Sequence, residues 1–332
     1  MRVAVLGAGA VGGMFAALLD RAGCDVEVTA RGDNLAAIRE HGIRLDGGFG
    51  EHVARVAAGE HLTVRPDLAL VTTKAHDGAG AIAPERELLD GVPVIISQNG
   101  LGGLAVAHEL LPRSPLVGAL VLTAVSFLEP GRVTVTAPLP TIIGRGPGCS
   151  EATLERVRDL LEPTGIELEL TPDLPAAQWS KLMINHVNAL PAIVGMSVQE
   201  VVADDDLRRI LAVSLVESAR VARASGVRFT DLQGYRGEMF ESMADAPISV
   251  VEGFVRDFAA RLGPVPNPAS TLQSIRRGRL TEIDYLNGAT VQAAAAVGLD
   301  TPVNRALVEL VHEVERTGQH LTPAEVVERI PV

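Results

Sequence analysis

The first thirteen residues constrain the fold of this chain more than any other stretch. Residues Arg2 to Leu6 form an apolar run with the length of a buried parallel strand, and a glycine-rich turn follows directly. The turn reads Gly7-Ala8-Gly9-Ala10-Val11-Gly12, and an apolar helical pattern comes after it. In such a G-x-G-x-x-G turn, the first glycine makes the tight turn, the second lets the backbone approach a pyrophosphate and the third lets helix and strand pack closely. The sequence therefore predicts a dinucleotide site at Gly7 to Gly12; the alternative is a strand–helix turn without a ligand.

The end of the next predicted strand indicates which dinucleotide is bound. This strand covers Asp25 to Thr29 and is followed by Ala30 and Arg31. NAD-binding units carry an acidic residue about twenty residues after the glycines, where it binds the ribose 2′-hydroxyl. A guanidinium at this position suits a 2′-phosphate instead. The sequence predicts NADP(H); the alternative is a solvated Arg31 beside Asp33, which would cap a helix.

Two further buried strands end in polar residues. The run Leu68 to Thr73 ends at Lys74, and the run Val92 to Ser97 ends at Gln98-Asn99-Gly100. Ligands of doubly wound sheets bind outside the carboxyl ends of the strands. We therefore expect Lys74 and Asn99 to contact cofactor or substrate, and the alternatives are a surface lysine and an Asn-Gly turn.

The strand pattern stops near a proline-marked connector at residues 171–175, and helical patterns follow it. Together with the length of 332 residues, this predicts an α/β chain of two domains. We expect an N-terminal Rossmann-type dinucleotide-binding domain at residues 1–172 and an all-α C-terminal domain at residues 173–332. Residues 118–127 and 133–135 are predicted to form a hairpin that extends the sheet. Helices are predicted at residues 176–190, 205–225, 249–262, 268–278, 281–297 and 301–317, and Gly226, Gly278, Gly298 and Gly318 are predicted to end four of them.

One predicted helix carries polar residues on an otherwise apolar background. Lys181, Asn185 and Asn188 fall at i, i+4 and i+7, which places an ammonium and two carboxamides on one face. A solvated face usually carries Glu, Lys and Gln rather than two helix-disfavouring asparagines. We expect these three residues to bind a polar ligand, and the alternative is a solvated face.

A second polar cluster follows later in the helical part. Asn267 is predicted to cap a helix that begins at Pro268, with Ser270 in the first turn near exposed amides that favour an anion. Thr281 is predicted to cap another helix whose first turn contains Glu282 and Asp284, and compensation of the helix dipole explains these two acids equally well. We interpret His76 and His186 as ordinary surface or packing residues.

The composition excludes several classes of function. A formal net charge of -12 argues against a nucleic-acid partner. The longest apolar run, at residues 118–127, is much shorter than the roughly 20 residues of a membrane-spanning helix, and no leader sequence is apparent. Cys24 and Cys149 lie in unrelated contexts, which argues against a disulfide or a metal site. We expect a soluble, cytoplasmic protein, and the long apolar helices after Asp205 make a homodimer possible.

Taken together, these motifs resemble those of the ketopantoate reductase family (2-dehydropantoate 2-reductases) over nearly the full length. The resemblance implies a C-terminal domain like that of 6-phosphogluconate dehydrogenase, and NADPH-dependent reduction of ketopantoate to (R)-pantoate on the route to pantothenate and coenzyme A. The matching motifs are Gly7-x-Gly9-x-x-Gly12, Lys74, Gln98-Asn99-Gly100, Lys181-Leu182-x-x-Asn185, Asn267-x-x-Ser270, and Thr281-Glu282-Ile283-Asp284-Tyr285-x-Asn287-Gly288.

The resemblance also implies roles for individual residues. Lys181 would give the proton to the carbonyl oxygen and Glu282 would engage the lysine and the substrate hydroxyl. Asn99 and Asn185 would orient the carbonyl oxygen. Asn267 and Ser270 would hold the substrate. Asn188 is assigned to the substrate from the polar helix face that it shares with Lys181 and Asn185. Lys74, Asn99 and Glu282 would also contact the cofactor.

The chain departs from the family pattern at some positions. Many members carry a second asparagine eight residues after the lysine, where this chain has Ala189, with Asn188 one residue earlier. The segment from Arg228 to Pro247 has no clear counterpart. Two other functions therefore stay open: a related enzyme that reduces a different 2-oxo acid, and a non-catalytic protein that senses NADP(H).

Overall fold

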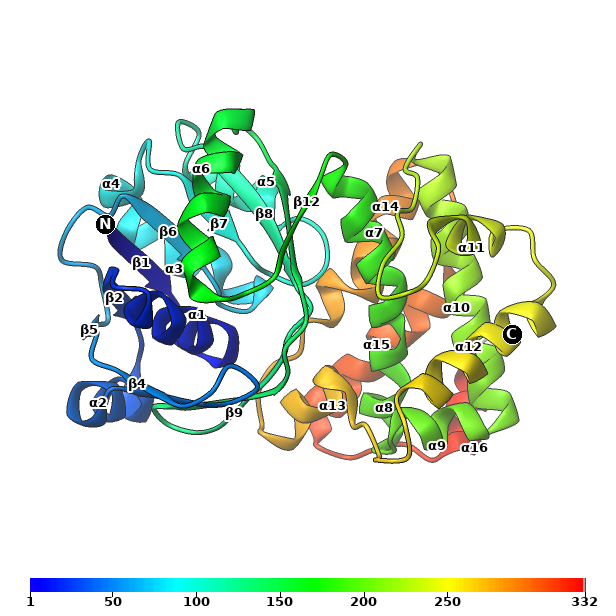
Figure 1. Cartoon of the computed structure of the whole chain (residues 1–332). Helices are drawn as coiled ribbons and strands as arrows, with labels where there is room; N and C mark the ends of the chain where they lie inside the picture. Colours follow the sequence, from blue (N-terminus) through cyan, green and yellow to red (C-terminus); the bar gives the residue numbers. More distant parts are fainter. Residues whose placement is uncertain (331) are drawn as a thin grey trace. The chain divides into compact units, whose positions relative to one another are not determined.

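The computed structural model describes residues 1–330 and 332, and the chain divides into two compact units, Met1–Leu174 and Pro175–Val332 (Figure 1). The first unit combines strands and helices, and the second is helical. The predicted fold class, an N-terminal Rossmann-type unit followed by an all-α unit, is confirmed. The boundary lies two residues after the one that the sequence predicts.

Unit 1 is built on a large, mostly parallel sheet. Six neighbouring strands, in the order β5-β2-β1-β6-β7-β8, pair in parallel, which is the order of a dinucleotide-binding fold. Strand β11 pairs antiparallel with β8, and β12 completes the sheet. The strands are, in spatial order, β12 (Leu168–Thr171), β11 (Thr141–Arg145), β8 (Leu116–Val121), β7 (Val94–Ile96), β6 (Leu68–Val71), β1 (Arg2–Leu6), β2 (Asp25–Thr29) and β5 (Ala57–Gly59).

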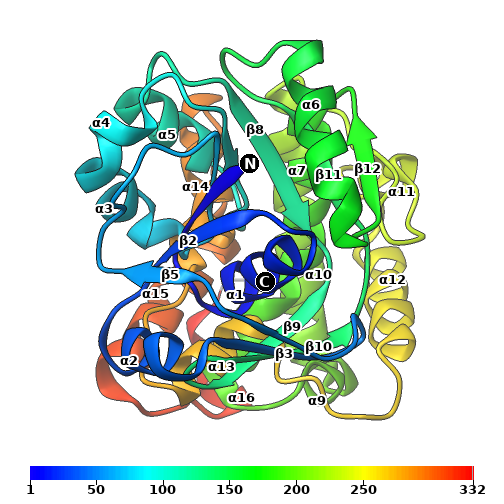
Figure 2. The same cartoon turned by 60° about the vertical axis from the view of Figure 1, so that its left-hand side comes forward.

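The two faces of this sheet carry separate cores because side chains alternate along each strand. Val3 and Val5 of β1 belong to the core that includes α1 and α6, whereas Ala4 and Leu6 belong to the core that includes α3, α4 and α5 (Figure 2). Both faces are therefore covered, as the unbroken apolar strands predict. The helices of unit 1 are α1 (Ala10–Arg21), α2 (Gly32–His41), η1 (Ala75–Asp77), α3 (Gly78–Ile82), η2 (Ala83–Glu85), α4 (Arg86–Leu89), α5 (Gly103–Leu110), α6 (Glu151–Leu161) and η3 (Glu162–Thr164).

The predicted hairpin does not extend the main sheet. The apolar run at residues 118–127 breaks after β8, where the Thr123 hydroxyl donates to the carbonyl of Leu139 at 2.6 Å. The chain then enters a second sheet with the order β4-β3-β10-β9, in which β9 pairs antiparallel with β10. Its strands are β3 (Ile43–Gly47), β4 (His52–Ala54), β9 (Ala124–Glu129) and β10 (Arg132–Ala137). The prediction was wrong because a continuous apolar run does not reveal where a strand changes sheets.

Unit 2 packs around α10, which contacts α9, α11, α12, α14, α15 and α16. Asp204 caps α10 by accepting from the amides of Asp206 and Leu207, at 3.1 and 3.0 Å. In the part of the chain that the structure describes, none of the helices has the length and apolar character that a membrane crossing needs. The helices are α7 (Leu174–Asn185), η4 (His186–Asn188), α8 (Ala189–Val194), α9 (Val198–Ala203), α10 (Asp205–Ala224), α11 (Gly237–Ser242), α12 (Ile248–Arg261), α13 (Ala269–Arg276), η5 (Ile283–Tyr285), α14 (Asn287–Ala296), α15 (Pro302–Thr317) and α16 (Pro323–Arg329).

Two of the predicted helices are interrupted. Residues 176–190 divide into α7, the short turn η4 and α8, and residues 281–297 begin with a bend and η5 before α14 starts at Asn287. The four glycines predicted to end helices all have a positive φ, between 60° and 70°. This conformation favours glycine, so the predicted helix stops are confirmed.

The segment from Arg228 to Pro247 contributes an aromatic cluster. Its Phe229, Tyr235 and Phe240 pack against Phe254 and Phe258 of α12, with ring centroids 5.3 to 6.4 Å apart. This cluster contains half of the aromatic residues of the chain, seven Phe, two Tyr and one Trp in all. The segment is therefore a packed part of unit 2 rather than a loose insertion.

Candidate active site

The glycine turn of unit 1 leaves open space at one position only among its three motif glycines. A Cβ on Gly7 would lie 2.6 Å from Cγ2 of Thr73, and a Cβ on Gly12 would lie 2.0 Å from the carbonyl oxygen of Gly7. A Cβ on Gly9 meets nothing within 4 Å. Gly7 and Gly12 are thus required by the fold, whereas Gly9 keeps free the space that a pyrophosphate would occupy.

The helix behind this turn is suited to an anion. Helix α1 starts at Ala10, no side chain caps its N-terminus, and its first turn contains no acidic residue. The amides of the first turn therefore point, with the positive end of the helix dipole, to the space beside Gly9.

The structure brings the other predicted residues of unit 1 to the same edge of the sheet. The strand register pairs Leu6 with Thr29 and with Val71, and Val71 with Ile96. The glycine turn, Arg31, Lys74 and Asn99 therefore follow the carboxyl ends of four adjacent strands, β1, β2, β6 and β7. The Thr72 hydroxyl donates to the carbonyl of Gly7 at 2.8 Å and links two of these strand ends.

Arg31 precedes helix α2 in an extended conformation, and its side chain is exposed. Within the described residues, no hydrogen bond or ion pair holds its guanidinium. The alternative role for Asp33 does not apply, since the N-cap position is Arg31 itself and Asp33 lies in the first turn without capping the helix.

Two residues to which the sequence assigned no role support these strand ends. Asn34 donates to the carbonyl of Ala8 at 2.8 Å and accepts from the amide of Gly131 at 2.8 Å. Gln98 donates to the carbonyl of Lys74 at 3.2 Å and fills the space beside Gly78 and Gly103, where a Cβ would come within 2.7 Å of its carboxamide. These glycines mark the close approach of a side chain, which only the fold reveals.

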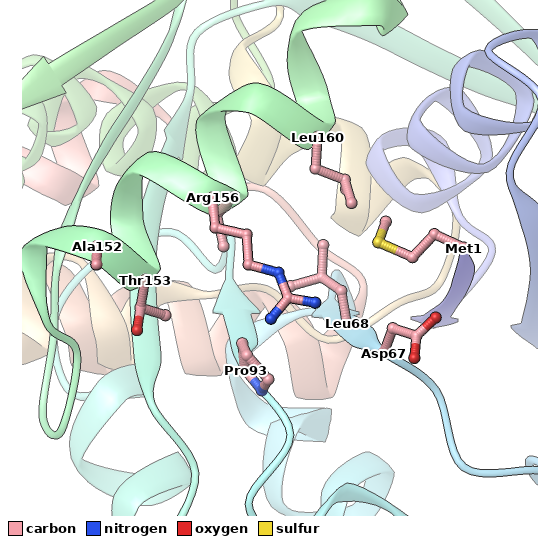
Figure 3. Close-up of a pocket in the computed structure, with 9 residues that line it drawn as sticks. Met1, Asp67, Leu68, Pro93, Ala152, Thr153, Arg156 and Leu160 are labelled. Atoms are coloured by element: carbon pink, nitrogen blue, oxygen red, sulfur yellow. The ribbon is translucent and has the colours of Figure 1, made fainter.

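A pocket of about 240 Å³ in unit 1 lies elsewhere. It is lined by Met1, Asp67 and Pro93, which precede β1, β6 and β7, and by Arg156 and Leu160 of α6 (Figure 3). It therefore opens at the amino ends of the strands, opposite the glycine turn. This pocket is no part of the candidate site.

In unit 2, Lys181 of α7 interacts electrostatically with Glu282, which immediately precedes η5. Burial lowers the pKa of the Lys181 ammonium from its ordinary value to about 8, and the negative charge of Glu282 acts in the opposite direction. Both side chains are half-buried. Glu282 does not lie in the first turn of an α-helix as predicted, because residues 281–286 form a bend and a short 3-10 turn before α14.

The composition contains a further signal for this lysine. Lys74 and Lys181 are the only lysines of the chain, and all the other residues among the 29 Lys and Arg are arginines. Arginine replaces lysine easily in surface ion pairs, but it cannot give up its proton near neutral pH. Both lysines occur at predicted site positions, so the scarcity of lysine in this chain is itself a sequence signal for Lys181.

The remaining predicted residues of unit 2 contact one another at the break between α7 and α8. Asn188 donates to the carbonyl of Asn185 at 2.8 Å, and its Oδ1 accepts from the amide of Ser270 at 3.1 Å and from the Ser270 hydroxyl at 3.4 Å. Asn267 accepts from the amide of Ala269 at 2.9 Å, but Pro268 takes the N-cap position of α13. The predicted cap was therefore wrong by one residue, and Asn188 rather than an external anion binds the Ser270 amide.

His186 is a core residue, as expected. Its side chain is fully buried, with Nδ1 2.8 Å from the carbonyl of Leu182 and Nε2 2.5 Å from the Ser218 hydroxyl. Burial lowers the pKa of His186 to about 4, so the ring is neutral. His76 is half-buried, and its Nε2 lies 3.4 Å from a carboxylate oxygen of its neighbour Asp77.

The sequence matches the models of one family in both units. Residues 3–148 match the model described as ketopantoate reductase PanE/ApbA, and residues 173–315 match its C-terminal model. A 2-dehydropantoate 2-reductase of Halobacterium salinarum is 30% identical over 325 residues, which cover 96% of this chain and 100% of the relative. A 2-dehydropantoate 2-reductase of Pyrococcus horikoshii is 28% identical over 320 residues, which cover 96% and 99%.

Solved structures agree with these matches. A PanE/ApbA family ketopantoate reductase from Ralstonia eutropha JMP134 superposes with a TM-score of 0.83 at 28% identity, covering 96% of this chain and 100% of that one. A D-mandelate dehydrogenase solved with NADH and anilino(oxo)acetate has the same fold, with a TM-score of 0.83 at 22% identity and coverage of 96% and 99%. With both family models matched over most of its length, and with the glycine turn and the Lys181–Glu282 pair in place, this chain belongs to the ketopantoate reductase family.

Proposed function

We propose that this protein reduces 2-dehydropantoate (ketopantoate) to (R)-pantoate with NADPH, on the route to pantothenate and coenzyme A. The observation that carries the proposal is the lowered pKa of Lys181 beside the charge of Glu282. Relatives that align over nearly their whole length are named 2-dehydropantoate 2-reductase, which supports the same reaction. A homodimer, with unit 2 contributing the interface, is part of the proposal.

The residues of unit 1 fit a nicotinamide dinucleotide. The space beside Gly9 and the uncapped N-terminus of α1 suit its pyrophosphate, and the exposed guanidinium of Arg31 suits a 2′-phosphate. Lys74 and Asn99 would bind the part of the cofactor that extends over β6 and β7. The D-mandelate dehydrogenase of the same fold was solved with NADH, so the choice of NADPH rests on Arg31.

The residues of unit 2 supply the acid chemistry. When bound, the reduced nicotinamide supplies a hydride to the keto carbon. Lys181 would give a proton from Nζ to the oxygen that gains negative charge, because a cationic group that can also release a proton stabilises that charge best. A pKa of about 8 makes Lys181 a stronger acid than an ordinary lysine while leaving it mostly protonated at neutral pH. Glu282 would maintain that protonation and would also contact the substrate hydroxyl and the cofactor.

The asparagines and Ser270 would recognise the acid. Asn99 and Asn185 would orient the keto oxygen, and the linked group of Asn188, Asn267 and Ser270 would hold the polar end of the substrate. The Ser270 amide binds Asn188 at 3.1 Å and the Ser270 hydroxyl donates to the same oxygen at a longer 3.4 Å, so this hydroxyl would turn to the substrate at the smaller cost. Ala189 at the position of a second asparagine in many family members favours testing other 2-oxo acids beside ketopantoate.

The test measures the rate of NADPH oxidation with each member of a panel of 2-oxo acids that includes ketopantoate. We expect ketopantoate to give the highest kcat/KM and NADH to be used less well. A higher kcat/KM on another 2-oxo acid would support the related enzyme instead. NADPH binding without oxidation by any acid of the panel would favour the sensing protein.

A further inference from the structure

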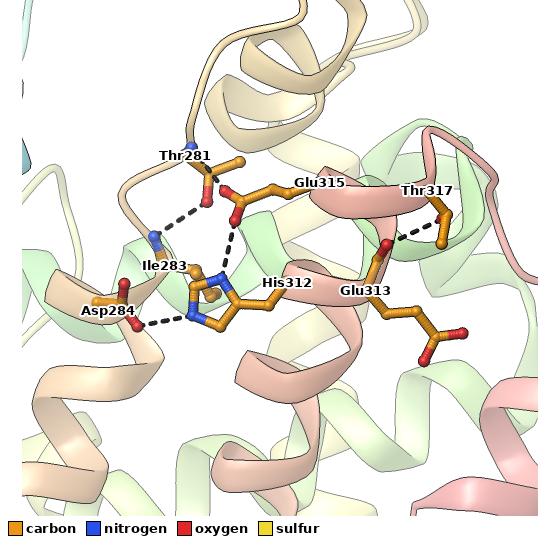
Figure 4. A network of polar contacts seen from close by, with 7 residues as sticks. All are labelled: Thr281, Ile283, Asp284, His312, Glu313, Glu315 and Thr317. Atoms are coloured by element: carbon orange, nitrogen blue, oxygen red, sulfur yellow. Dashed lines mark hydrogen bonds and ion pairs between the residues drawn. The ribbon is translucent and has the colours of Figure 1, made fainter.

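The turn that carries Glu282 is bound to helix α15 on both sides of this residue (Figure 4). On the N-terminal side, the amide of Thr281 donates to Oε1 of Glu315 at 2.7 Å. On the C-terminal side, Nε2 of His312 lies 2.9 Å from Oδ1 of Asp284. Nδ1 of His312 lies 2.8 Å from Oε2 of Glu315 and joins the two contacts. Glu282 and Ile283 thus lie between the two anchored residues, Thr281 and Asp284.

The turn is also rigid in itself. Thr281 accepts from the amide of Ile283 at 3.2 Å, and the amides of Tyr285 and Leu286 donate to the carbonyl of Glu282 at 2.9 and 3.1 Å. The Ile283 side chain is 1% exposed and packs in the core. The backbone at Glu282 is therefore held by hydrogen bonds within the turn, and Thr281 and Asp284 link this turn to α15.

The charges of this network support one another. Partial burial acts to lower the pKa of His312, but the hydrogen bonds to Glu315 and Asp284 outweigh it, so the pKa lies above the usual value. Burial acts to raise the pKa of Glu315, but hydrogen bonds from Thr281 and His312 outweigh it, so the pKa lies below the usual value. A histidine donates from both ring nitrogens only when it is protonated, and that form matches the two carboxylates that face it.

We propose that His312 and Glu315 are positioning residues, which hold Glu282 where its charge acts on Lys181. This inference rests on the proposed function for its catalytic meaning but not for its structural test. Neither residue belongs to the motifs matched above. Neither is assigned a contact with the substrate or the cofactor.

The test uses the fact that the chain contains only two lysines. Protein labelled with ¹³C-lysine gives two side-chain signals, which the Lys74→Arg variant assigns. Titration of the Lys181 signal measures its pKa without any substrate. Glu282→Gln removes the charge that raises this pKa, so the shift in this variant measures how much Glu282 contributes to the pKa of Lys181.

We expect His312→Phe to lower the pKa of Lys181 in the same direction as Glu282→Gln, by about half a unit or more, which is a threefold change in the protonation constant. The variant that combines His312→Phe with Glu282→Gln should have the same Lys181 pKa as Glu282→Gln alone, because both substitutions remove the same interaction. Glu313→Gln is the matched control: it removes an ion pair to Arg329 of α16 from the neighbouring position of α15, and it should leave the pKa of Lys181 unchanged.

Asp284→Ala provides a second variant if His312→Phe fails to fold, since the Asp284 side chain is 62% exposed and its removal leaves the core intact. A folded His312→Phe or Asp284→Ala protein in which Lys181 keeps the native pKa would overturn the inference. In the assay of NADPH oxidation, His312→Phe should lower kcat about tenfold and shift the alkaline limb of the pH profile to lower pH. If the native protein oxidised NADPH with none of the 2-oxo acids, the proposed function would be refuted. The titration of Lys181 would still decide the role of His312.

Discussion

Asn188 accepts a hydrogen bond from the backbone amide of Ser270 at 3.1 Å, so two residues assigned to the substrate form one structural unit. This contact joins the break between α7 and α8 to the start of α13. Substitution of either residue is therefore expected to affect the other.

Asn188→Ala should raise KM for the 2-oxo acid more than Ser270→Ala does. The alanine at position 188 leaves the Ser270 amide without its acceptor, whereas Ser270→Ala keeps that bond and removes only the hydroxyl. A lost hydrogen bond of this kind costs about 1.5 kcal/mol, or roughly tenfold in KM. Steady-state kinetics and a fluorescence titration with NADPH measure the two effects. Unchanged KM in both variants, or an equal loss of NADPH affinity, would show that these residues do not bind the acid.

Gly9→Ala and Gly12→Ala should separate cofactor binding from stability. The new Cβ at position 9 meets no protein atom within 4 Å, so the free energy of unfolding should change little while NADPH affinity falls tenfold or more. The new Cβ at position 12 would lie 2.0 Å from a backbone oxygen, so that variant should lose several kcal/mol of stability. Urea unfolding and NADPH titration test both. Native NADPH affinity in Gly9→Ala would place the dinucleotide elsewhere.

Arg31→Ala should weaken the binding of NADPH far more than that of NADH. A charge-assisted contact to a phosphate contributes roughly 1.5 to 3 kcal/mol, which is tenfold or more in affinity. Arg39→Ala, in the helix α2 that follows Arg31, is the control, because the Arg39 guanidinium donates to the carbonyl of Ala58 at 3.0 Å. Calorimetric titration with the two cofactors measures the ratio of their affinities. Equal affinities in the native protein would contradict the assignment of NADPH.

The buried His186 should make the protein less stable in mild acid. The pKa of His186 is about 4 in the folded protein and near 6.5 in the unfolded chain. Below pH 6.5 the unfolded chain therefore binds a proton that the folded protein does not, and the free energy of unfolding falls as the pH is lowered toward 4. The loss is about 3 kcal/mol between these values. The free energy of unfolding in urea should change less between pH 7 and pH 4.5 in His186→Phe than in the native protein, although the variant is less stable at pH 7. Thr290→Val, which removes a hydroxyl 3.3 Å from the ring, should keep the native dependence.

The sequence predicted the parts of the fold in which one local pattern decides the outcome. The strand before Gly7 and the glycine stops after four helices follow from apolar periodicity and backbone conformation. The change of sheet after β8 and the interruption at residues 186–188 could not be predicted, because they depend on side chains distant in sequence, such as the contact of Thr123 with Leu139. In the same way, the hydrogen bonds of Asn34 with Ala8, of Gln98 with Lys74 and of His312 with Asp284 join residues more than 20 positions apart, which no local pattern predicts.

The most direct test of the account is kcat for Lys181→Ala and Lys181→Arg on the best 2-oxo acid. Loss of a general acid should lower kcat by about 10² to 10⁴ fold while the Kd for NADPH stays nearly unchanged. Arginine should not restore the rate, because its guanidinium keeps its proton near neutral pH. In the native protein, kcat/KM should fall above pH 8, as the ammonium with a pKa of about 8 deprotonates. A kcat within about threefold of native for Lys181→Ala would contradict the account, since a general acid contributes at least about 10² fold.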